Sequence, residues 1–391
     1  MLFLWGDMMK VKLGDVCEIV SGTTPKSNCP EYWNGELNWI TPAELNDDIV
    51  VVNESQRKIT TKAVIDSNLR SFPAGTVLLS SRAPIGKVAI AGKEMYCNQG
   101  FKNLICSDFI YNKYLFYFLK SKVAYLNSLG RGATFKEISK TIVENIQINL
   151  PKKEEQYKIV YILDKIIEII SLRQQQLKKL DELVKSRFIE MFGDVIHNSK
   201  KWQNCLFSEI TSSRLGKMLD AKQQTGRNSY PYLANFNVQW FRFNLKNLNK
   251  MDFDEKDRSE FELCEGDLLV CEGGEIGRCA VWHNELQPCF FQKALHRVRC
   301  NRQIILPDYL SWWFRYNCDY GGFAALAGSK ATIAHLPGTK LKQLQVVVPP
   351  VELQEQFVTF VKKTDKSKLE IQKSLDKLEI LKKSLMQQYF G

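Results

Sequence analysis

Two stretches of the chain carry apolar residues at intervals of three or four, with charged residues between them. They cover residues 154–192 and 352–390, and neither contains proline or glycine. This spacing places the apolar side chains on one face of an α-helix. Proline precedes each stretch and glycine ends it, so the pattern predicts two helices of about 55 to 60 Å. In the first helix the apolar face comprises Ile159, Ile162, Ile166, Ile169 or Ile170, Leu177, Leu180, Val184 and Phe188.

An isolated helix of this length with an apolar stripe needs a partner. The nearest candidate for each predicted helix is the other one, and we expect the two to pair as a coiled coil. The competing interpretation is that the stripes join separate copies of the chain.

The remaining sequence predicts domains of mixed α and β structure. Short runs rich in β-branched residues favour strands, and amphipathic runs with aromatic inner faces favour helices. The predicted strands are residues 76–79, 87–90, 147–150, 267–271, 279–282 and 345–348, and the predicted helices are residues 114–121 and 309–316.

The chain is an internal repeat, because the markers of its first half return in the same order about 190 to 200 residues later. The segment 74–90 returns as 265–281, and the helix ending 174–193 returns as 372–391. Little similarity is present between residues 21–70 and residues 213–262. A repeated framework with divergent inserts predicts one architecture that reads two different targets.

Composition points to a folded protein with a polyanionic partner. The chain has 391 residues, of which 45% are hydrophobic, and a formal net charge of +11. No basic tail carries this excess, so we expect basic patches on folded surfaces. An ordinary basic protein without such a partner is the plainer alternative.

Cysteine usage and the N-terminal residues favour the cytoplasm. The 11 cysteines are scattered and form no Cys-x-x-Cys motif, which is typical of reduced thiols. The apolar start at residues 2–5 is too short for a signal peptide, and no apolar run approaches 20 residues.

Several catalytic motifs are missing from the sequence. No Asn-Pro-Pro or Asp-Pro-Pro is present to hold a flipped adenine, and Gly86-Lys87 is followed by Val88 where a phosphate-binding loop needs Ser or Thr. The pair Pro307-Asp308 lacks the Glu-x-Lys of a nuclease centre, and the four histidines lack ligand or triad spacing. We therefore expect no catalytic site in this chain.

A set of short motifs, each found in order and most of them twice, gives the chain a family resemblance. They are Gly14-Asp15-Val16, Ser21-Gly22-Thr23-Thr24-Pro25, Tyr32-Trp33, Trp39-Ile40, the repeated Gly-rich strand pairs, Gly132-Ala133-Thr134, Glu155-Gln156, Pro349-Pro350-Val351-Glu352-Leu353-Gln354-Glu355-Gln356 and the two Phe-Gly helix endings. The chain resembles the specificity subunit of type I restriction-modification enzymes. Two segments depart from the expected pattern. Pro151-Lys152-Lys153 differs from the family's usual helix entrance, and the second copy has Ser329-Lys330 where the first has Arg131-Gly132.

The resemblance implies an α+β fold with two tandem mixed α/β target-recognition domains, each followed by a long helix. The two helices would pair as an antiparallel coiled coil with pseudo-twofold symmetry. The expected parts are residues 1–150, the first target-recognition domain, 151–193, the first spacer helix, 194–348, the second domain, and 349–391, the second helix.

The same resemblance implies a non-catalytic function in a cytoplasmic complex. Each domain would read one half of a bipartite, asymmetric site in double-stranded DNA, and the helices would set the gap. Two methyltransferase subunits, and restriction subunits through them, would be the partners and would carry S-adenosylmethionine, ATP and magnesium. A stand-alone two-headed DNA-binding regulator and a nuclease with an unrecognised active site are the alternatives.

Candidate DNA-contacting residues come from two kinds of position. Cations beside tight, glycine-containing turns suit phosphate groups, and polar residues in the divergent inserts suit base edges. The phosphate candidates are Arg82, Lys87, Arg131, Lys136, Arg278 and Lys330. The base-reading candidates are Thr24, Lys26, Asn38, Lys217, Asn235, Asn237 and Gln239.

Overall fold

The computed structural model describes residues 9–46, 49–82, 84–132, 136–220, 224–324 and 335–391. Contacts between residues divide the chain into two units. Unit 1 comprises Met1–Gln174 and Gln372–Gly391, and unit 2 comprises Gln175–Ile371. Each unit holds one globular domain and about half of each long helix. No helix within the described ranges is long and apolar enough to cross a membrane.

The domain of unit 1 is built from short strands, α-helices and single turns of 3-10 helix (η). In chain order these are β1 (Met9–Lys12), α1 (Leu13–Val16), β2 (Cys17–Ser21), η1 (Pro30–Tyr32), β3 (Trp33–Ile40), η2 (Pro42–Glu44), β4 (Val51–Val52), β5 (Arg57–Ile59), α2 (Thr61–Asp66), β6 (Val77–Leu79), β7 (Val88–Ala91), β8 (Tyr96–Cys97), β9 (Lys102–Cys106), α3 (Asn112–Ser121), α4 (Val123–Leu129), α5 (Lys140–Glu144) and β10 (Gln147–Leu150).

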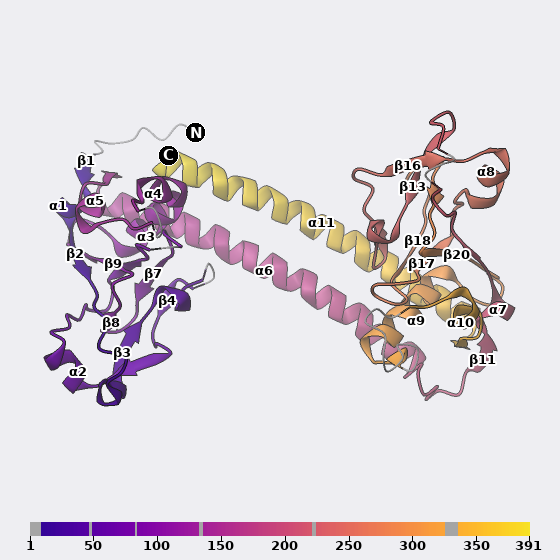
Figure 1. The fold of residues 1–391 in the computed structure, drawn as a ribbon, viewed down its shortest axis with the longest axis horizontal. Coiled ribbons are helices and arrows are strands. Elements are labelled where there is room, and N and C mark those ends of the chain that lie inside the picture. Colours follow the sequence, from indigo (N-terminus) through magenta and orange to yellow (C-terminus); the bar gives the residue numbers. More distant parts are fainter. Residues whose placement is uncertain (1–8, 47–48, 83, 133–135, 221–223, 325–334) are drawn as a thin grey trace. The chain divides into compact units, whose positions relative to one another are not determined.

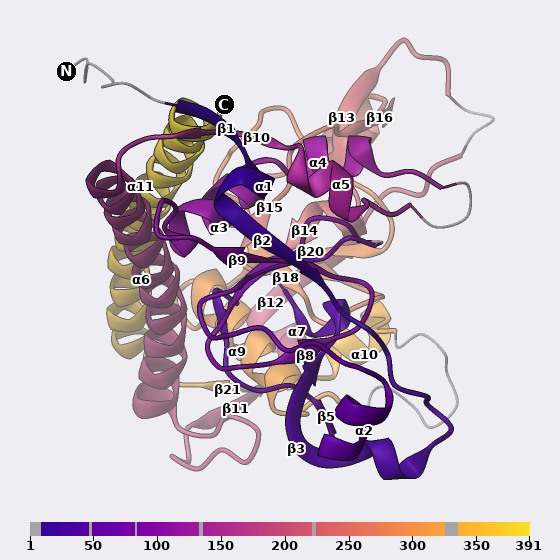
Figure 2. The same cartoon turned by 90° about the vertical axis from the view of Figure 1, so that its left-hand side faces the viewer.

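Two sheets and a short ladder organise this domain. The larger sheet has the strand order β2-β9-β6-β7-β4, and the smaller has the order β5-β3-β8. β1 pairs with β10 in a separate antiparallel ladder. The smaller sheet and α2 lie at the end of the domain opposite to this ladder (Figures 1 and 2). The divergent insert therefore supplies an end of the domain that is remote from the attachment of the helices.

The domain of unit 2 contains a corresponding set of elements. In chain order these are β11 (Gln203–Leu206), α7 (Phe207–Ile210), β12 (Thr211–Leu215), β13 (Ser229–Leu233), η4 (Asn235–Asn237), β14 (Val238–Gln239), β15 (Arg242–Phe243), β16 (Asn249–Asp252), α8 (Glu255–Phe261), β17 (Leu268–Cys271), β18 (Cys279–Val281), β19 (Phe290–Phe291), β20 (Leu295–Cys300), α9 (Pro307–Asp319), α10 (Gly338–Lys342) and β21 (Gln345–Val348).

The divergent inserts share one strand topology despite their different sequences. In unit 1, β3 runs antiparallel to β5 and parallel to β8. In unit 2, β13 runs antiparallel to β16 and parallel to β19. The larger sheets also correspond, since unit 2 has the order β12-β20-β17-β18. The repeat thus extends through the segments in which the sequence shows little similarity.

The two long helices are α6 (Lys153–Phe192) and α11 (Val351–Phe390). In unit 1 the beginning of α6, at Ile159 and Leu163, shares a buried core with Phe390 at the end of α11. In unit 2 the rings of Phe188 and Phe357 lie 5.4 Å apart, which joins the end of α6 to the beginning of α11. Within each unit the helices therefore run antiparallel, as predicted (Figure 1).

The predicted apolar face of α6 is correct at most positions and wrong at Ile162, and of the alternatives Ile169 and Ile170 the second is the buried one. Ile159, Ile166 and Ile170 are buried. Ile162 and Ile169 are 39% and 40% exposed. Where several isoleucines are adjacent, the three-four spacing fits more than one face, and only packing selects among them.

A buried glutamine fastens each domain to its helix. Gln156 lies in the first turn of α6 with no exposed surface. Its Oε1 accepts a hydrogen bond from the backbone N–H of Tyr111 at 2.7 Å, and its Nε2 donates to the carbonyls of Phe109 and Pro151, both at 2.9 Å. The side chain therefore joins the loop before α3 to the beginning of α6.

The same arrangement recurs in unit 2. Gln354 is fully buried near the beginning of α11. Its Oε1 accepts from the backbone N–H of Leu306 at 2.8 Å, and its Nε2 donates to the carbonyls of Ile304 and Pro349 at 3.0 and 2.8 Å. Both joints satisfy buried backbone groups that would otherwise lack partners.

Replacing either glutamine with leucine should destabilise the fold. Gln156→Leu and Gln354→Leu each leave a buried N–H and two carbonyls unpaired, which costs about 2 to 4 kcal/mol in total. A loss of this size lowers the melting temperature by roughly 5 to 10 °C. Thermal unfolding measures the effect, and Gln175→Leu on the exposed surface of α6 is the matched control. Equal melting temperatures for all three variants would contradict this role.

Candidate nucleic-acid interface

Three cationic residues of unit 1 converge on Glu137. Arg82 Nε donates to its Oε2 at 2.9 Å, and Lys102 Nζ donates to its Oε1 at 3.2 Å. Arg131 and Glu137 exchange two backbone hydrogen bonds, at 3.0 and 2.9 Å. Burial alone would raise the pKa of Glu137, but the hydrogen bonds and charges of Lys102 and Arg82 lower it overall. The carboxylate therefore stays charged and holds the exposed Arg82, while the backbone of Glu137 holds the segment of the exposed Arg131 beside it.

Thr24 lies on the same edge of the domain. Its hydroxyl donates to the side-chain oxygen of Gln99, and the neighbouring Gly100 carbonyl accepts from the N–H of Ser81, next to Arg82, at 2.7 Å. Gly22 makes this approach possible, because a Cβ there would lie 2.1 Å from the carbonyl of Cys97. Short links thus connect the candidates Thr24, Arg82 and Arg131.

Two tryptophans hold the loop that carries Lys26. Trp33 Nε1 donates to the carbonyl of Lys26 at 3.2 Å, and Trp39 Nε1 donates to the carbonyl of Thr23 at 3.1 Å. The Lys26 side chain is exposed. Lys136 is also exposed and directly precedes Glu137. Both lysine side chains are therefore accessible to a ligand. The role of the two tryptophans in positioning the loop of Lys26 was not evident from the sequence.

Lys87 and Asn38 form hydrogen bonds within the domain. Lys87 Nζ donates to the carbonyl of Pro42 at 3.0 Å, and Asn38 Oδ1 accepts from the N–H of Ser55 at 3.2 Å. Arg278, the repeat equivalent of Lys87, likewise donates to the carbonyl and side-chain oxygens of Asn235, both at 3.1 Å. These two cations fasten each insert to its larger sheet, so each already uses part of its hydrogen-bonding capacity inside the fold.

The remaining candidates of unit 2 are mostly held by internal bonds. Asn237 is 1% exposed, and its amide bonds the N–H of Ala234 and the carbonyl of Asn244. It is therefore not a candidate base reader. Lys217 Nζ donates to the carbonyl of Asp252 at 2.7 Å and pairs with the carboxylate of Asp257.

Asn235 and Gln239 keep part of their polar surface. Asn235 Nδ2 donates to the carbonyl of Gly273 at 2.9 Å, and Gln239 Nε2 lies 3.4 Å from the carbonyl of Phe236. Both side chains are half-buried. Lys330 lies outside the described residues, and so does the Ala331-Thr332 marker.

An open basic groove in unit 2 was not evident from the sequence. It has a volume of about 970 Å³ and lies between β12, α8 and α10. Its cationic lining residues are Arg214, Lys217, Lys256, Lys293 and Lys342. Acidic side chains on α8 partly offset this charge, through the ion pairs of Arg214 with Glu260 and Lys217 with Asp257. No local pattern could have revealed the groove, because its residues are far apart in the chain.

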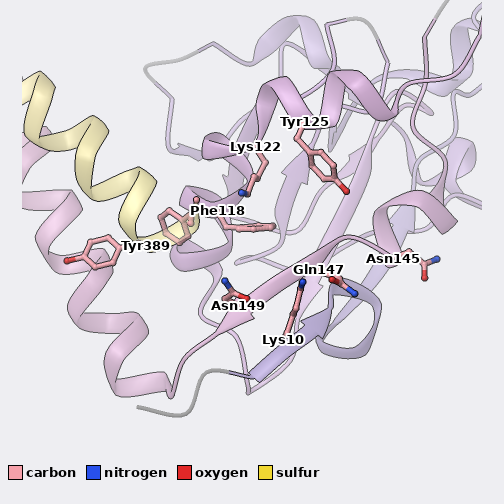
Figure 3. Close-up of a pocket in the computed structure, with 10 residues that line it drawn as sticks. Lys10, Phe118, Lys122, Tyr125, Asn145, Gln147, Asn149 and Tyr389 are labelled. Carbon is pink, nitrogen blue, oxygen red and sulfur yellow. The ribbon is translucent and has the colours of Figure 1, made fainter. Parts of the chain in front are cut away.

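A second cavity, in unit 1, is separate from the Arg82 loop. It has a volume of about 430 Å³ and lies between the β1-β10 ladder, helices α3 and α4 and the end of α11 (Figure 3). Lys10, Lys122, Gln147 and Asn149 line it together with aromatic rings. Its described lining residues include no Asp, Glu, His or Cys side chain.

Potential metal ligands form no cluster in the part of the chain that the structure describes. No three His, Cys, Asp or Glu side chains there come together as metal ligands could. His296 is buried, and burial lowers its pKa while the nearby carbonyl of Leu336, 3.0 Å from Nε2, opposes the shift. His197 and His283 are exposed and pair with Asp194 and Glu265.

Comparison with known proteins identifies the family of both repeats. Residues 6–182 and 199–381 each match the family described as type I restriction modification DNA specificity domain. The chain belongs to this family. Both matched segments contain a whole domain and most of the following helix, so the specificity domain corresponds to the repeat found in the sequence.

Individual specificity subunits are similar to parts of the chain. The type I restriction enzyme MjaIX specificity subunit of Methanocaldococcus jannaschii is 39% identical over 191 residues, which cover 48% of this chain and 44% of that protein. The EcoR124I/EcoR124II specificity subunit of Escherichia coli is 27% identical over 206 residues, which cover 51% of this chain and 50% of that protein. The matched part spans about half the length of these curated relatives.

Solved structures of specificity subunits share the fold along the whole chain. The type I restriction-modification S subunit from M. genitalium has a TM-score of 0.58 at 15% identity, covering 98% of this chain and 96% of that one. The HsdS subunit from Thermoanaerobacter tengcongensis has a TM-score of 0.54 at 16% identity, with the same coverage of both chains. At these identities the likeness concerns the specificity-family fold alone.

Proposed function

We propose that this chain is the non-catalytic DNA-specificity subunit of a type I restriction-modification system. Each domain would read one half of a bipartite, asymmetric DNA site, and the two long helices would fix the gap between the halves. The observation that carries the proposal is that two specificity-domain matches coincide with two domains of one topology but different exposed side chains. A scaffold repeated within the chain, with different side chains on its surface, suits two half-sites of different sequence.

In unit 1 the DNA would lie along the edge that carries Thr24, Lys26, Arg82, Arg131 and Lys136. These side chains are exposed and are held on loops that hydrogen bonds connect. Cations at fixed positions favour phosphate contacts, which orient a duplex without reading its sequence. In unit 2 the basic groove of β12, α8 and α10 and the side chains of Asn235 and Gln239 support the corresponding role.

The proposed partners are two methyltransferase subunits and, through them, restriction subunits. Large apolar side chains are exposed on both helices, and a docked subunit would cover them. Examples are Tyr161 of α6, which is 64% exposed, and Ile380 of α11, which is 69% exposed. S-adenosylmethionine, ATP and magnesium would bind those subunits, and the complex would act in the cytoplasm.

Incubation of DNA with labelled S-adenosylmethionine tests this function. The pure chain should neither methylate nor cut DNA, and adding a co-expressed modification subunit should produce adenine methylation at one bipartite sequence. Turnover by the pure chain would support the nuclease or another self-sufficient enzyme instead. Sequence-specific binding that no modification subunit converts into methylation would support the stand-alone regulator.

Arg82 and Lys87 should respond differently to substitution, although they lie on the same turn. Arg82→Ala should weaken binding to specific and non-specific DNA alike and lower the slope of log affinity against log salt by about one unit, as expected for one lost phosphate contact. Lys87→Met should leave that slope unchanged, because its ammonium is bonded to the carbonyl of Pro42. DNA binding measured over a salt series checks both. An Arg82→Ala slope equal to that of the unaltered chain would remove Arg82 from the interface.

A further inference from the structure

Two exposed residues occupy the same position of the smaller sheet in the two units. In unit 1, Trp39 of β3 lies between Arg57 on β5 and Tyr96 on β8. In unit 2, Tyr232 of β13 lies between Asn249 on β16 and Phe290 on β19. The pairing register therefore makes Arg57 and Asn249 equivalent. Both are exposed, whereas their strand neighbours Ile59 and Met251 are buried at corresponding positions.

Arg57 is held in a fixed orientation with its hydrogen-bond donors available. Its guanidinium carbon lies 3.7 Å from the ring centre of Trp33 and 5.2 Å from that of Trp39. Stacking on an aromatic ring restrains the guanidinium plane and leaves its edge free to donate. Among the residues that the structure describes, no carboxylate forms an ion pair with Arg57. The same two tryptophans also anchor the loop of Thr23 and Lys26, so this loop and Arg57 form one surface.

Asn249 lies on β16, and hydrogen bonds to Asp252 fix the other end of this strand. Asp252, at the other end of β16, accepts hydrogen bonds from the backbone N–H groups of Thr225 and Gly226 at 2.5 and 2.8 Å. These bonds support the low pKa of Asp252, for which the Thr225 hydroxyl is the largest cause. No hydrogen bond between described residues engages the Asn249 amide, in contrast to Asn237 and Asn38.

Arginine and asparagine side chains form hydrogen bonds with different bases of DNA. Arginine pairs in bidentate fashion with O6 and N7 of guanine in the major groove, and asparagine pairs with N6 and N7 of adenine. We infer that Arg57 and Asn249 are equivalent base-reading residues, with Arg57 specifying a guanine in one half-site and Asn249 an adenine in the other. The inference rests on the proposed function and names specificity residues within it.

Exchange of the two residues provides a direct test. The unaltered chain and the variants Arg57→Asn and Asn249→Arg are each co-expressed with a type I modification subunit in a host without other adenine methylation. Genome-wide methylation then reveals the recognised sequence. Arg57→Asn should reduce discrimination in favour of guanine at one position about 10-fold or more and leave the other half-site unchanged. Asn249→Arg should change one adenine in that other half-site.

Matched controls separate base reading from charge and folding. Lys58→Asn removes a cation from the same strand, but Lys58 points to the opposite face and pairs with Glu54 at 3.1 Å. Lys250→Asn is the equivalent control in unit 2. Both should keep the original recognition sequence. Arg57→Lys retains the charge without a bidentate fork, so it should relax the guanine preference without creating an adenine preference.

The outcomes distinguish this inference from the function on which it rests. A normal bipartite sequence from the unaltered complex, together with the same sequence from Arg57→Asn and Asn249→Arg, would overturn the inference alone. Absence of any bipartite sequence from the unaltered complex would overturn the proposed function and the inference with it. A base change in the control variants but not in the Arg57 and Asn249 variants would assign reading to the opposite face of these strands.

Discussion

Insertion of four residues into each long helix, after Gln176 and after Ser374, will widen the gap of the recognised DNA site by one or two base pairs. Four helical residues add about 6 Å. Since DNA rises about 34 to 36 Å in 10 to 10.5 base pairs, this length equals between one and two base pairs. Both helices are extended because α6 and α11 pass through both units and pair in each of them. Methylome sequencing of a strain that carries the variant measures the new gap.

A length-neutral variant controls for damage to the helices. Gln176→Ala and Ser374→Ala together change the same positions without adding length, and the original gap should persist. Four residues exceed one helical turn of 3.6 and rotate the apolar face by about 40°, so some loss of stability accompanies the longer gap. Unchanged half-sites at the original spacing in the insertion variant would show that the helices do not set the gap.

Replacement of residues 21–145 with the equivalent part of another specificity-family protein will change one half-site completely and leave the other unchanged. The exchanged segment contains the smaller sheet and the loops of Thr24, Arg82 and Arg131, whereas the β1-β10 ladder remains native. Residues 203–348 build a second domain with its own buried core. The recognised sequences, read from genome methylation, should therefore share only one half with those of the parent.

The reciprocal exchange of residues 213–343 provides the control. It should change the other half-site and preserve the first. New bases in both halves after either exchange would indicate a single composite reading surface, which is incompatible with two independent domains.

The sequence predicts the framework well because its signals are local. Both long helices, the strands β6, β7 and β10 and their counterparts β17, β18 and β21 are confirmed, and so are the helices that contain Tyr114 and Tyr309. Each of these elements has a clear apolar spacing or a run of β-branched residues. The smaller sheets lacked such a signal, because β5 and β8 are only three and two residues long and pair with distant strands.

The candidate site was harder to predict because side-chain roles depend on distant backbone groups. Lys87 and Asn237 look like surface residues in the sequence, yet each bonds a carbonyl that only the folded chain brings near. The sequence analysis did not identify Arg57 as a candidate, because its role depends on the pairing of strands. Its position opposite Trp39, and the equivalence with Asn249, follow from strand register, which the sequence of either insert does not reveal.

The joints at Gln156 and Gln354 explain how such a protein can acquire new targets. Among the described residues, the hydrogen bonds from each glutamine side chain to its domain all go to main-chain N–H and carbonyl groups. A foreign domain can use the same joint if its chain passes through the same points and keeps apolar side chains that pack on the helices, as Tyr114 and Tyr309 do. Recombination between related genes can therefore graft an evolved domain onto an existing pair of helices in a single event. If each domain reads its own half-site, as proposed, exchange of a whole domain would create a new combination of half-sites.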